Sequence, residues 1–395
     1  MRISTQSFFQ RNLSGMGSLQ EQLLRVQQKL GTGTKFLTPA EDPVAAARTL
    51  RVGQSLAETA QYAASRARAS QALSTEESAL SSATTVLQEV KALIVQAGNG
   101  TMTDADRLTL GTALESSFSQ LLGIANTDDG NGQFLFAGYQ GDRTPFVLQP
   151  DGSVQYLGDQ GQRLMQVDVA RQLSGADDGR SVFQSVQGGA RHVTTADPAN
   201  TGSGWFGAVA VSGGGEYAVS FAGSPLQYTI SDGTTTATGT YEPGATIALG
   251  GLSLRLDGSP AAGDVFRVQP AADAGTDVFA AIRDVIAALK QPLATGGAAA
   301  QAALRNALST GNVKLTNAHD NVLTVRSSVG SRMAELEALD AGGAWRELTD
   351  RAYLSELQDL DYASAISEFS LRQTNLQATQ QTFARLQDIA LFKYL

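Results

Sequence analysis

The 395-residue chain contains no cysteine, which excludes disulfide bonds, zinc–thiolate clusters and a cysteine nucleophile. Histidine is nearly as scarce, since His192 and His319 are the only two in the sequence. Without cysteine the chain gives no redox indication of its compartment, so a secreted location stays open. Histidine chemistry is therefore limited to two positions, and cysteine chemistry is excluded.

Basic residues and long apolar runs are also in short supply. The chain has 29 Lys and Arg against 38 Asp and Glu, a net charge of −9. Nucleic-acid affinity depends largely on lysine and arginine, so we expect no nucleic-acid partner. No apolar run approaches the roughly 18 residues that span a bilayer, so we expect no membrane insertion. Residues 1–9 lack the apolar core of a signal peptide, and we expect no general secretion signal.

The composition changes twice along the chain. Up to about Ala125, and again from Asp277, Ala, Leu, Gln, Glu and Arg dominate and apolar residues recur at helical spacing. Between Gln133 and Ala274 the residues Gly, Thr, Ser and Val take over, with turn signals such as Asp232-Gly233. This order predicts an α+β multidomain protein, with a long helical coiled-coil rod formed by both chain ends and a β-rich domain inserted in the middle.

Four stretches carry apolar residues at the alternating three- and four-residue steps of a coiled-coil seam. The first is Met16, Leu19, Leu23, Val26 and Leu30, before Gly31 and Gly33. The second is Leu73, Leu80, Leu87 and Ile94, with Ala83 and Val90 between them. The third follows a predicted cap at Thr103 and Asp106 and contains Leu110, Leu114, Phe118 and Leu121. The fourth is Leu308, Leu315, Val322, Val329 and Leu336, seven residues apart, with Ala318, Val325 and Leu339 between them. We expect the second and fourth seams to pack together.

A last helical stretch is predicted after a break at Ala341-Gly342-Gly343, and its stripe contains Ile366, Phe369, Leu376 and Phe383. Because the first and last helices each expose an apolar stripe without a local partner, we expect the two ends of the chain to pair. The predicted division is residues 1–40 with 344–395 as terminal helical arms, 41–132 with 276–343 as the rod, and 133–275 as the β-rich insertion.

The segment between the first and second helices combines several helix signals. Thr38 and Glu41 have the spacing of a capping box with Pro39 at the first helical position. Proline inside a helix costs about 3 kcal/mol, so one helix running from Thr38 through Pro43 is disfavoured. We therefore expect the long helix to begin near Pro43.

This segment, residues 31–45, resembles the corresponding stretch of the flagellin family, which includes the flagellins and the hook-associated proteins. The resemblance extends to residues 1–5 (MRIST), to 134–138 (FLFAG, predicted to be a strand) with 144–146 (TPF), and to the closing residues 391–395 (LFKYL). It covers both helical ends, about two-thirds of the chain. The β-rich segment matches nothing as firmly.

The resemblance implies a structural adaptor of the bacterial flagellum at the hook–filament junction, outside the cell, exported by the flagellar type III apparatus. Its implied partners are hook-associated protein 1, flagellin, further copies of itself in a ring, and an export chaperone at the C-terminal helix. The arms would line an inner tube and be disordered in the free monomer, the rod would form an outer tube, and the β domain would face outward. The implied assembly interface comprises Leu19, Leu23, Val26, Leu30, Ile366, Phe369, Leu376, Phe383, Phe392 and Leu395.

Alternatives remain open. Within the same class, the chain could be the flagellin filament subunit itself. From a different class, the β-rich segment could be a carbohydrate-binding or carbohydrate-active domain on a helical rod, because scattered carboxylates can meet in space. His319 could be half of a metal site, but a polar position on an exposed helix face is the simpler interpretation. We predict no catalytic residue, cofactor or metal ion.

Overall fold

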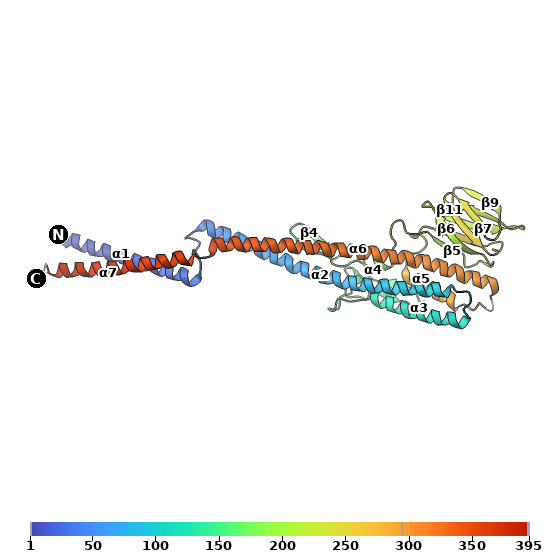
Figure 1. The fold of residues 1–395 in the computed structure, drawn as a ribbon, viewed down its shortest axis with the longest axis horizontal. Helices are drawn as coiled ribbons and strands as arrows, with labels where there is room; N and C mark the ends of the chain where they lie inside the picture. Colours follow the sequence, from blue (N-terminus) through green and yellow to red (C-terminus); the bar gives the residue numbers. More distant parts are fainter. Residues whose placement is uncertain (1, 294–295, 393–395) are drawn as a thin grey trace. The chain divides into compact units, whose positions relative to one another are not determined.

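The computed structural model describes residues 2–293 and 296–392 (Figure 1). The helices are α1 (Arg2–Thr32), α2 (Pro43–Ala97), α3 (Asp104–Ala125), α4 (Gly179–Phe183), α5 (Val278–Lys290), α6 (Gly297–Gln358) and α7 (Tyr362–Phe392), with one 3₁₀ turn, η1 (Leu135–Ala137). The strands are β1 (Phe146–Leu148), β2 (Val154–Tyr156), β3 (Leu164–Asp168), β4 (Arg171–Ser174), β5 (Val193–Ala196), β6 (Trp205–Val211), β7 (Tyr217–Ala222), β8 (Gln227–Ser231), β9 (Thr236–Thr240), β10 (Thr246–Leu249), β11 (Leu252–Asp257) and β12 (Val265–Gln269). Long helices at both ends and a β-rich middle confirm the predicted fold class.

The chain divides into two compact units. One contains Met1–Ala64 and Ala338–Leu395, and the other contains Ser65–Glu337. We call them the terminal unit and the central unit. The long helices α2 and α6 each contribute residues to both units.

The helix boundaries follow the capping signals in the sequence. Gly33 adopts a positive φ of 72°, which favours glycine and ends α1. The carboxylate of Asp42 accepts a hydrogen bond from the Ala45 amide at 2.8 Å at the start of α2. Thr103 and Asp106 form the reciprocal capping box at the start of α3. The expected helix starts at Pro43 and after Thr103 are confirmed.

Two local predictions are wrong. The expected break at Ala341-Gly342-Gly343 does not occur, because α6 continues through it and ends at Gln358. A glycine inside a helix costs only about 1 kcal/mol relative to alanine, which the rest of a 62-residue helix readily offsets. Residues 134–138 form no strand but contain the turn η1, where Phe136 is fully buried.

The predicted seam residues of α2 and α6 are buried in the helical core of the central unit. Leu73, Leu80 and Leu87 on α2 are fully buried, and so are Leu315 and Val329 on α6. Helices α3 and α5 pack against each other in the same unit (Figure 1). Both seams are buried in the same unit, and Arg326 of α6 joins the two helices by donating to Glu77 of α2 at 2.5 Å.

An aromatic cluster joins these helices to the first part of the insertion. The ring of Phe183 on α4 lies 5.4 Å from Phe136, 5.6 Å from Phe146 and 6.0 Å from Phe279 on α5, measured between ring centroids. Aromatic rings at these separations stabilise a core beyond the area that they bury. The segment that contains η1, β1 and α4 therefore belongs to the helical core.

Strands β5 to β12 form an antiparallel β-sandwich, while β1 pairs with β2 and β3 pairs with β4 in separate two-stranded sheets. One sheet has the order β5-β12-β7-β8-β9 and the other has the order β10-β11-β6. Alternate residues point inward, as shown by the buried Tyr217, Val219 and Phe221 of β7. Both sheets contribute to one core, in which Phe266 of β12 packs with Leu254 of β11.

Three buried asparagines on α6 hold the insertion to the helices. Asn306 accepts from the Phe206 amide and donates to the Gly204 carbonyl, both at 3.1 Å. Asn317 makes the same pair of bonds with the backbone of Arg191, at 3.0 and 2.8 Å. Asn321 donates to the carbonyls of Ser181 and Val182. Their amides satisfy backbone groups that would otherwise be buried without partners.

Candidate assembly interface

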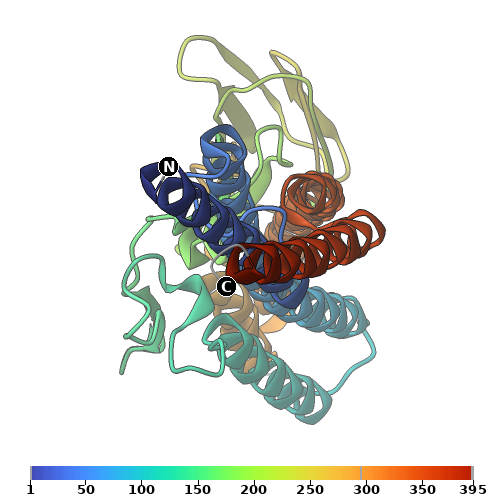
Figure 2. The same ribbon diagram turned by 90° about the vertical axis from the view of Figure 1, so that its left-hand side faces the viewer.

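In the terminal unit, the first and last helices lie side by side (Figure 2). The inward positions of α1 follow the predicted heptad spacing and continue it to Phe9 and Asn12. The inward positions of α7 are Ala365, Phe369, Arg372, Leu376, Thr379 and Phe383. The expected pairing of the two chain ends is therefore confirmed.

This seam is only partly closed. Among the side chains described in the two helices, only Val26 and Ala365 are buried, each with 6% of its surface exposed. Leu19, Leu23 and Leu376 are half-buried, although they occupy seam positions. A two-helix pair covers one side of each apolar residue and leaves the other side accessible to a further helix.

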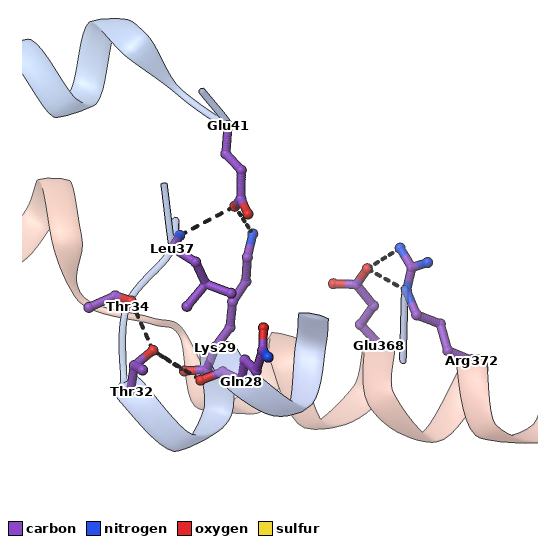
Figure 3. A network of polar contacts seen from close by, with 8 residues as sticks. All are labelled: Gln28, Lys29, Thr32, Thr34, Leu37, Glu41, Glu368 and Arg372. Carbon is purple, nitrogen blue, oxygen red and sulfur yellow. Dashed lines mark hydrogen bonds and ion pairs between the residues drawn. The ribbon is translucent and has the colours of Figure 1, made fainter. Parts of the chain in front are cut away.

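Specific contacts fix how α1 and α7 lie against each other. The rings of Phe9 and Phe383 meet edge to face with centroids 5.7 Å apart. Arg372 of α7 donates to the side-chain oxygen of Gln22 on α1. Its guanidinium also pairs with Glu368, one turn earlier on α7, at 2.5 Å (Figure 3). An apolar seam with few polar ties sets the register of the pair.

The turn after α1 is bonded to the turn before α7. The amide of Leu360 donates to the carbonyl of Gly33 at 2.9 Å, and the amide of Lys35 donates to the carbonyl of Gln358 at 2.8 Å. A β carbon at Gly33 would lie 2.9 Å from the Tyr362 hydroxyl, so glycine is required there for space as well as for its φ angle. These bonds hold the two interhelix turns together.

Glu41 closes the loop that leads into α2. Its carboxylate lies 2.8 Å from the Lys29 ammonium and accepts the Leu37 amide at 3.4 Å (Figure 3). The hydrogen bond from Lys29 is the main cause that lowers the pKa of Glu41 below its ordinary value. The carboxylate therefore stays ionised at neutral pH and keeps the loop folded back on α1.

The outward faces of the terminal unit carry large apolar side chains. Leu24 of α1 is 57% exposed and Ile366 of α7 is 54% exposed. Leu13 and Leu371 are exposed on the same two helices, and Trp345 is exposed on α6. Apolar side chains repeated along exposed helices are typical of surfaces that bind other proteins.

The residues predicted for the interface are placed as follows. Those at seam positions of the α1–α7 pair are Leu19, Leu23, Val26, Leu30, Phe369, Leu376 and Phe383. Ile366 does not share their stripe, because the inward position next to it is Ala365. Leu395 and the side chain of Phe392 lie outside the described residues.

The sequence reasoning missed Phe9, Ala365 and Arg372. Continuing the three–four spacing in both directions from the residues that it found would have located all three. An alanine and an arginine do not stand out as seam residues when only large apolar side chains are counted.

The described residues contain no group of three His, Asp or Glu side chains arranged to hold a metal ion. His319 is not on an exposed helix face as expected, because its side chain is only 13% exposed. It lies one turn after Leu315 on α6, close to the seam that packs on the other helices. Within the described parts of the chain, no helix combines the length and apolarity needed to cross a membrane.

Paired helices from the two chain ends and a β-rich insertion point to the flagellin class of structural proteins. In agreement, residues 3–141 match the family model described as the bacterial flagellin N-terminal helical region. The chain is 31% identical over 393 residues to flagellar hook-associated protein 3 of Escherichia coli strain K12 and to that of Salmonella typhimurium strain LT2. Each alignment covers 100% of this chain and 99% of the relative. The chain belongs to the family of flagellar hook-associated protein 3.

Solved structures agree with this assignment. FlgL of Xanthomonas campestris is 27% identical with a TM-score of 0.68, covering 77% of this chain and 99% of that one. Hook-associated protein 3 of Legionella pneumophila is 25% identical with a TM-score of 0.70, covering 78% of this chain and 98% of that one. A second Legionella structure, described as the flagellar junction protein FlgL, is 25% identical with a TM-score of 0.67 and covers 79% of this chain and 99% of that one.

Proposed function

We propose that this chain is the structural adaptor that joins the hook of the bacterial flagellum to its flagellin filament. The observation that carries this proposal is the full-length similarity to flagellar hook-associated protein 3 of two bacteria, at 31% identity. The alternative, a filament subunit, is less well supported, because those relatives are hook-associated proteins by name and a similar Legionella structure is described as a flagellar junction protein.

The adaptor binds hook-associated protein 1 on one side and flagellin on the other, and copies of it form a ring. The half-closed α1–α7 seam and the exposed Leu24 and Ile366 support this part of the proposal. A neighbouring helix that covered such residues would gain about 1.5–3 kcal/mol for each large side chain removed from water. The interface comprises the predicted residues Leu19, Leu23, Val26, Leu30, Ile366, Phe369, Leu376, Phe383, Phe392 and Leu395.

The terminal arms, predicted as residues 1–40 and 344–395, line the inner tube of this assembly. The helices predicted over 41–132 and 276–343 form the outer tube, and within the insertion predicted over 133–275 the β-sandwich faces outward. Export proceeds through the flagellar type III apparatus, with a chaperone on the C-terminal helix before assembly. The protein has no enzymatic activity of its own.

Immunogold labelling of purified flagella tests the location directly. An antibody raised against the β-sandwich, residues 193–269, should label the boundary between hook and filament and leave the filament shaft bare. Labelling along the whole filament would show a flagellin instead. A strain whose gene for this chain is deleted serves as the control and should grow hooks without filaments.

A further inference from the structure

A carboxyl group is buried in the central unit with fewer hydrogen bonds than a buried charge needs. Glu76 lies on α2 at the edge of the helical core, between the fully buried Leu73 and Leu80, and none of its own surface is exposed. An ionised carboxylate in such a place loses its hydration and needs several hydrogen bonds or a cation in exchange.

The contacts of Glu76 fall short of that requirement. Its Oε1 accepts one hydrogen bond, from the backbone amide of Asp177 at 3.0 Å. Its Oε2 is buried without any hydrogen-bond partner. An oxygen atom without a partner suits a protonated carboxyl, whose hydroxyl can donate to a neighbouring acceptor.

The charges that face Glu76 are those of Asp177, from the loop after β4, and Arg332 of α6. Arg332 is already engaged, because its guanidinium donates to Asp177 Oδ2 and, at 3.2 Å, to the carbonyl of Ser174. Arg332 is therefore paired with Asp177 and not with Glu76, and the negative charge of Asp177 acts on Glu76. The carboxylate of Asp178, next in the loop, accepts the Ser181 amide at 2.9 Å and caps α4.

Two further carboxylates on these helices are paired with other cations. Glu77 of α2 pairs with Arg326 of α6 at 2.5 Å, and Glu335 of α6 pairs with Arg171 of β4. Neither cation is free to neutralise Glu76. Burial, followed by the negative charge of Asp177, raises the pKa of Glu76 from 4.5 to about 8.

We propose that the proton on Glu76 is a latch that holds residues 171–183, from β4 through α4, against α2 and α6, and that alkaline surroundings open it. We call residues 171–183 the latch segment. The protonated carboxyl accepts the Asp177 amide with one oxygen and donates from the other to the Asp177 carboxylate. Loss of the proton places two negative charges side by side in a buried site with one arginine between them.

The direction of the pH effect follows from linkage. With the latch segment open, Glu76 is in water and titrates near 4.5; with it docked, Glu76 titrates near 8. Docking is therefore most stable below pH 4.5, weakens as the pH rises, and stops changing above about pH 8. The bonds from the Asn321 amide to the carbonyls of Ser181 and Val182 also hold the segment, and neither partner carries an ionisable group.

Hydrogen exchange of the purified full-length chain tests the latch. Protection factors, corrected for intrinsic exchange rates, would be measured by mass spectrometry for peptides from the latch segment at pH 6 and pH 9. We expect protection to fall about tenfold or more between these values in the wild type. In Glu76→Gln, whose amide donates and accepts without titrating, protection should stay constant and exceed that of the wild type at pH 9.

Two further measurements keep the test decisive. Glu77→Gln, which removes the carboxylate of the next residue, should keep the pH dependence of the wild type. Carbon NMR of the glutamate carboxyls in the wild type should show one group that titrates near pH 8, which disappears in Glu76→Gln. A midpoint for Glu76 below pH 6, or the same loss of protection in wild type and Glu76→Gln, would overturn the proposal.

Discussion

The terminal unit and the central unit use the same heptad spacing, but they close their seams to different extents. In the central unit Leu73, Leu80 and Leu87 have no exposed surface, and α2 is bonded there both to α6 and to the insertion. In the α1–α7 pair the corresponding leucines remain half-exposed. Equal spacing in the sequence therefore does not imply equal stability. The stability of a seam depends on how many other elements surround it.

This difference separates folding from assembly. Ordering one residue costs about 1–2 kcal/mol of backbone entropy, and burying a large apolar side chain returns about 1.5–3 kcal/mol. A seam that buries every third or fourth residue completely can offset that cost with help from helical hydrogen bonds. A half-buried seam returns less, so the α1–α7 pair depends on surfaces supplied by other subunits.

The largest expected effect comes from a charge in the closed seam. Val322 of α6 is 1% exposed, and Val322→Asp should destabilise the central unit by roughly 3–5 kcal/mol because the carboxylate has no partner there. Thermal melting followed by circular dichroism at 222 nm measures it. The adjacent Leu323 is 40% exposed, and Leu323→Asp is the matched control that should change the melting temperature little. Equal melting curves for Val322→Asp and wild type would show that this seam does not hold the central unit.

The second largest loss of stability is expected from removing an aromatic ring, and it differs between the two units. Phe183→Ala removes a ring packed against Phe136, Phe146 and Phe279 and should cost about 3–5 kcal/mol of unfolding free energy. Phe383 contacts Phe9 at a similar ring separation, but both rings are half-buried. Phe383→Ala should therefore cost less than about 1 kcal/mol in the monomer. Chemical denaturation measures both, and a large loss for Phe383→Ala would mean that the pair is stable by itself.

Much of this contrast could be predicted from the sequence, because it depends on local rules. Apolar spacing located the seams, and the signals at Gly33, Pro43 and Thr103 located helix ends. These local rules failed where contacts with residues distant in the sequence determine the conformation. Gly342 stays helical within a helix stabilised along its whole length, and Phe136 enters a cluster made with residues from three other segments.

The candidate interface shows the same limit. Heptad spacing found most of the α1–α7 seam, but it could not show that Gly33 accepts a hydrogen bond from Leu360, more than three hundred positions away. Nor could it separate Ile366 from the stripe, because a one-residue shift turns a helical side chain by about 100°. Only the packing of α7 on α1 assigns Ala365 inward and Ile366 outward.

Limited proteolysis sharpens the comparison without mutation. If the terminal arms order only on assembly, protease should cleave the free monomer rapidly before about Thr38 and after about Gln358, while residues 65–337 resist. Mass spectrometry of a time course identifies the cut sites. In the assembled junction the same sites should be protected. Arms that resist protease in a verified monomer would show that the α1–α7 pair is stable without partners.

The smallest effect on the monomer is expected on the outward face of α7. Ile366→Asp places a charge on a side chain that is already 54% exposed, so the melting temperature should change little. In the assembly, the same charge would be buried against a neighbour without a partner, which costs about 3–5 kcal/mol and should prevent incorporation.

Asn375 is also exposed on α7 but points to a different side of the helix, so Asn375→Asp is the control that adds a charge elsewhere. Electron microscopy of cells that express each variant in place of the wild type measures filament growth. Filaments in the Asn375→Asp strain and bare hooks in the Ile366→Asp strain would identify this face of α7 as an assembly contact. Normal filaments with Ile366→Asp would instead leave the half-closed seam between α1 and α7 as the surface that neighbouring subunits cover.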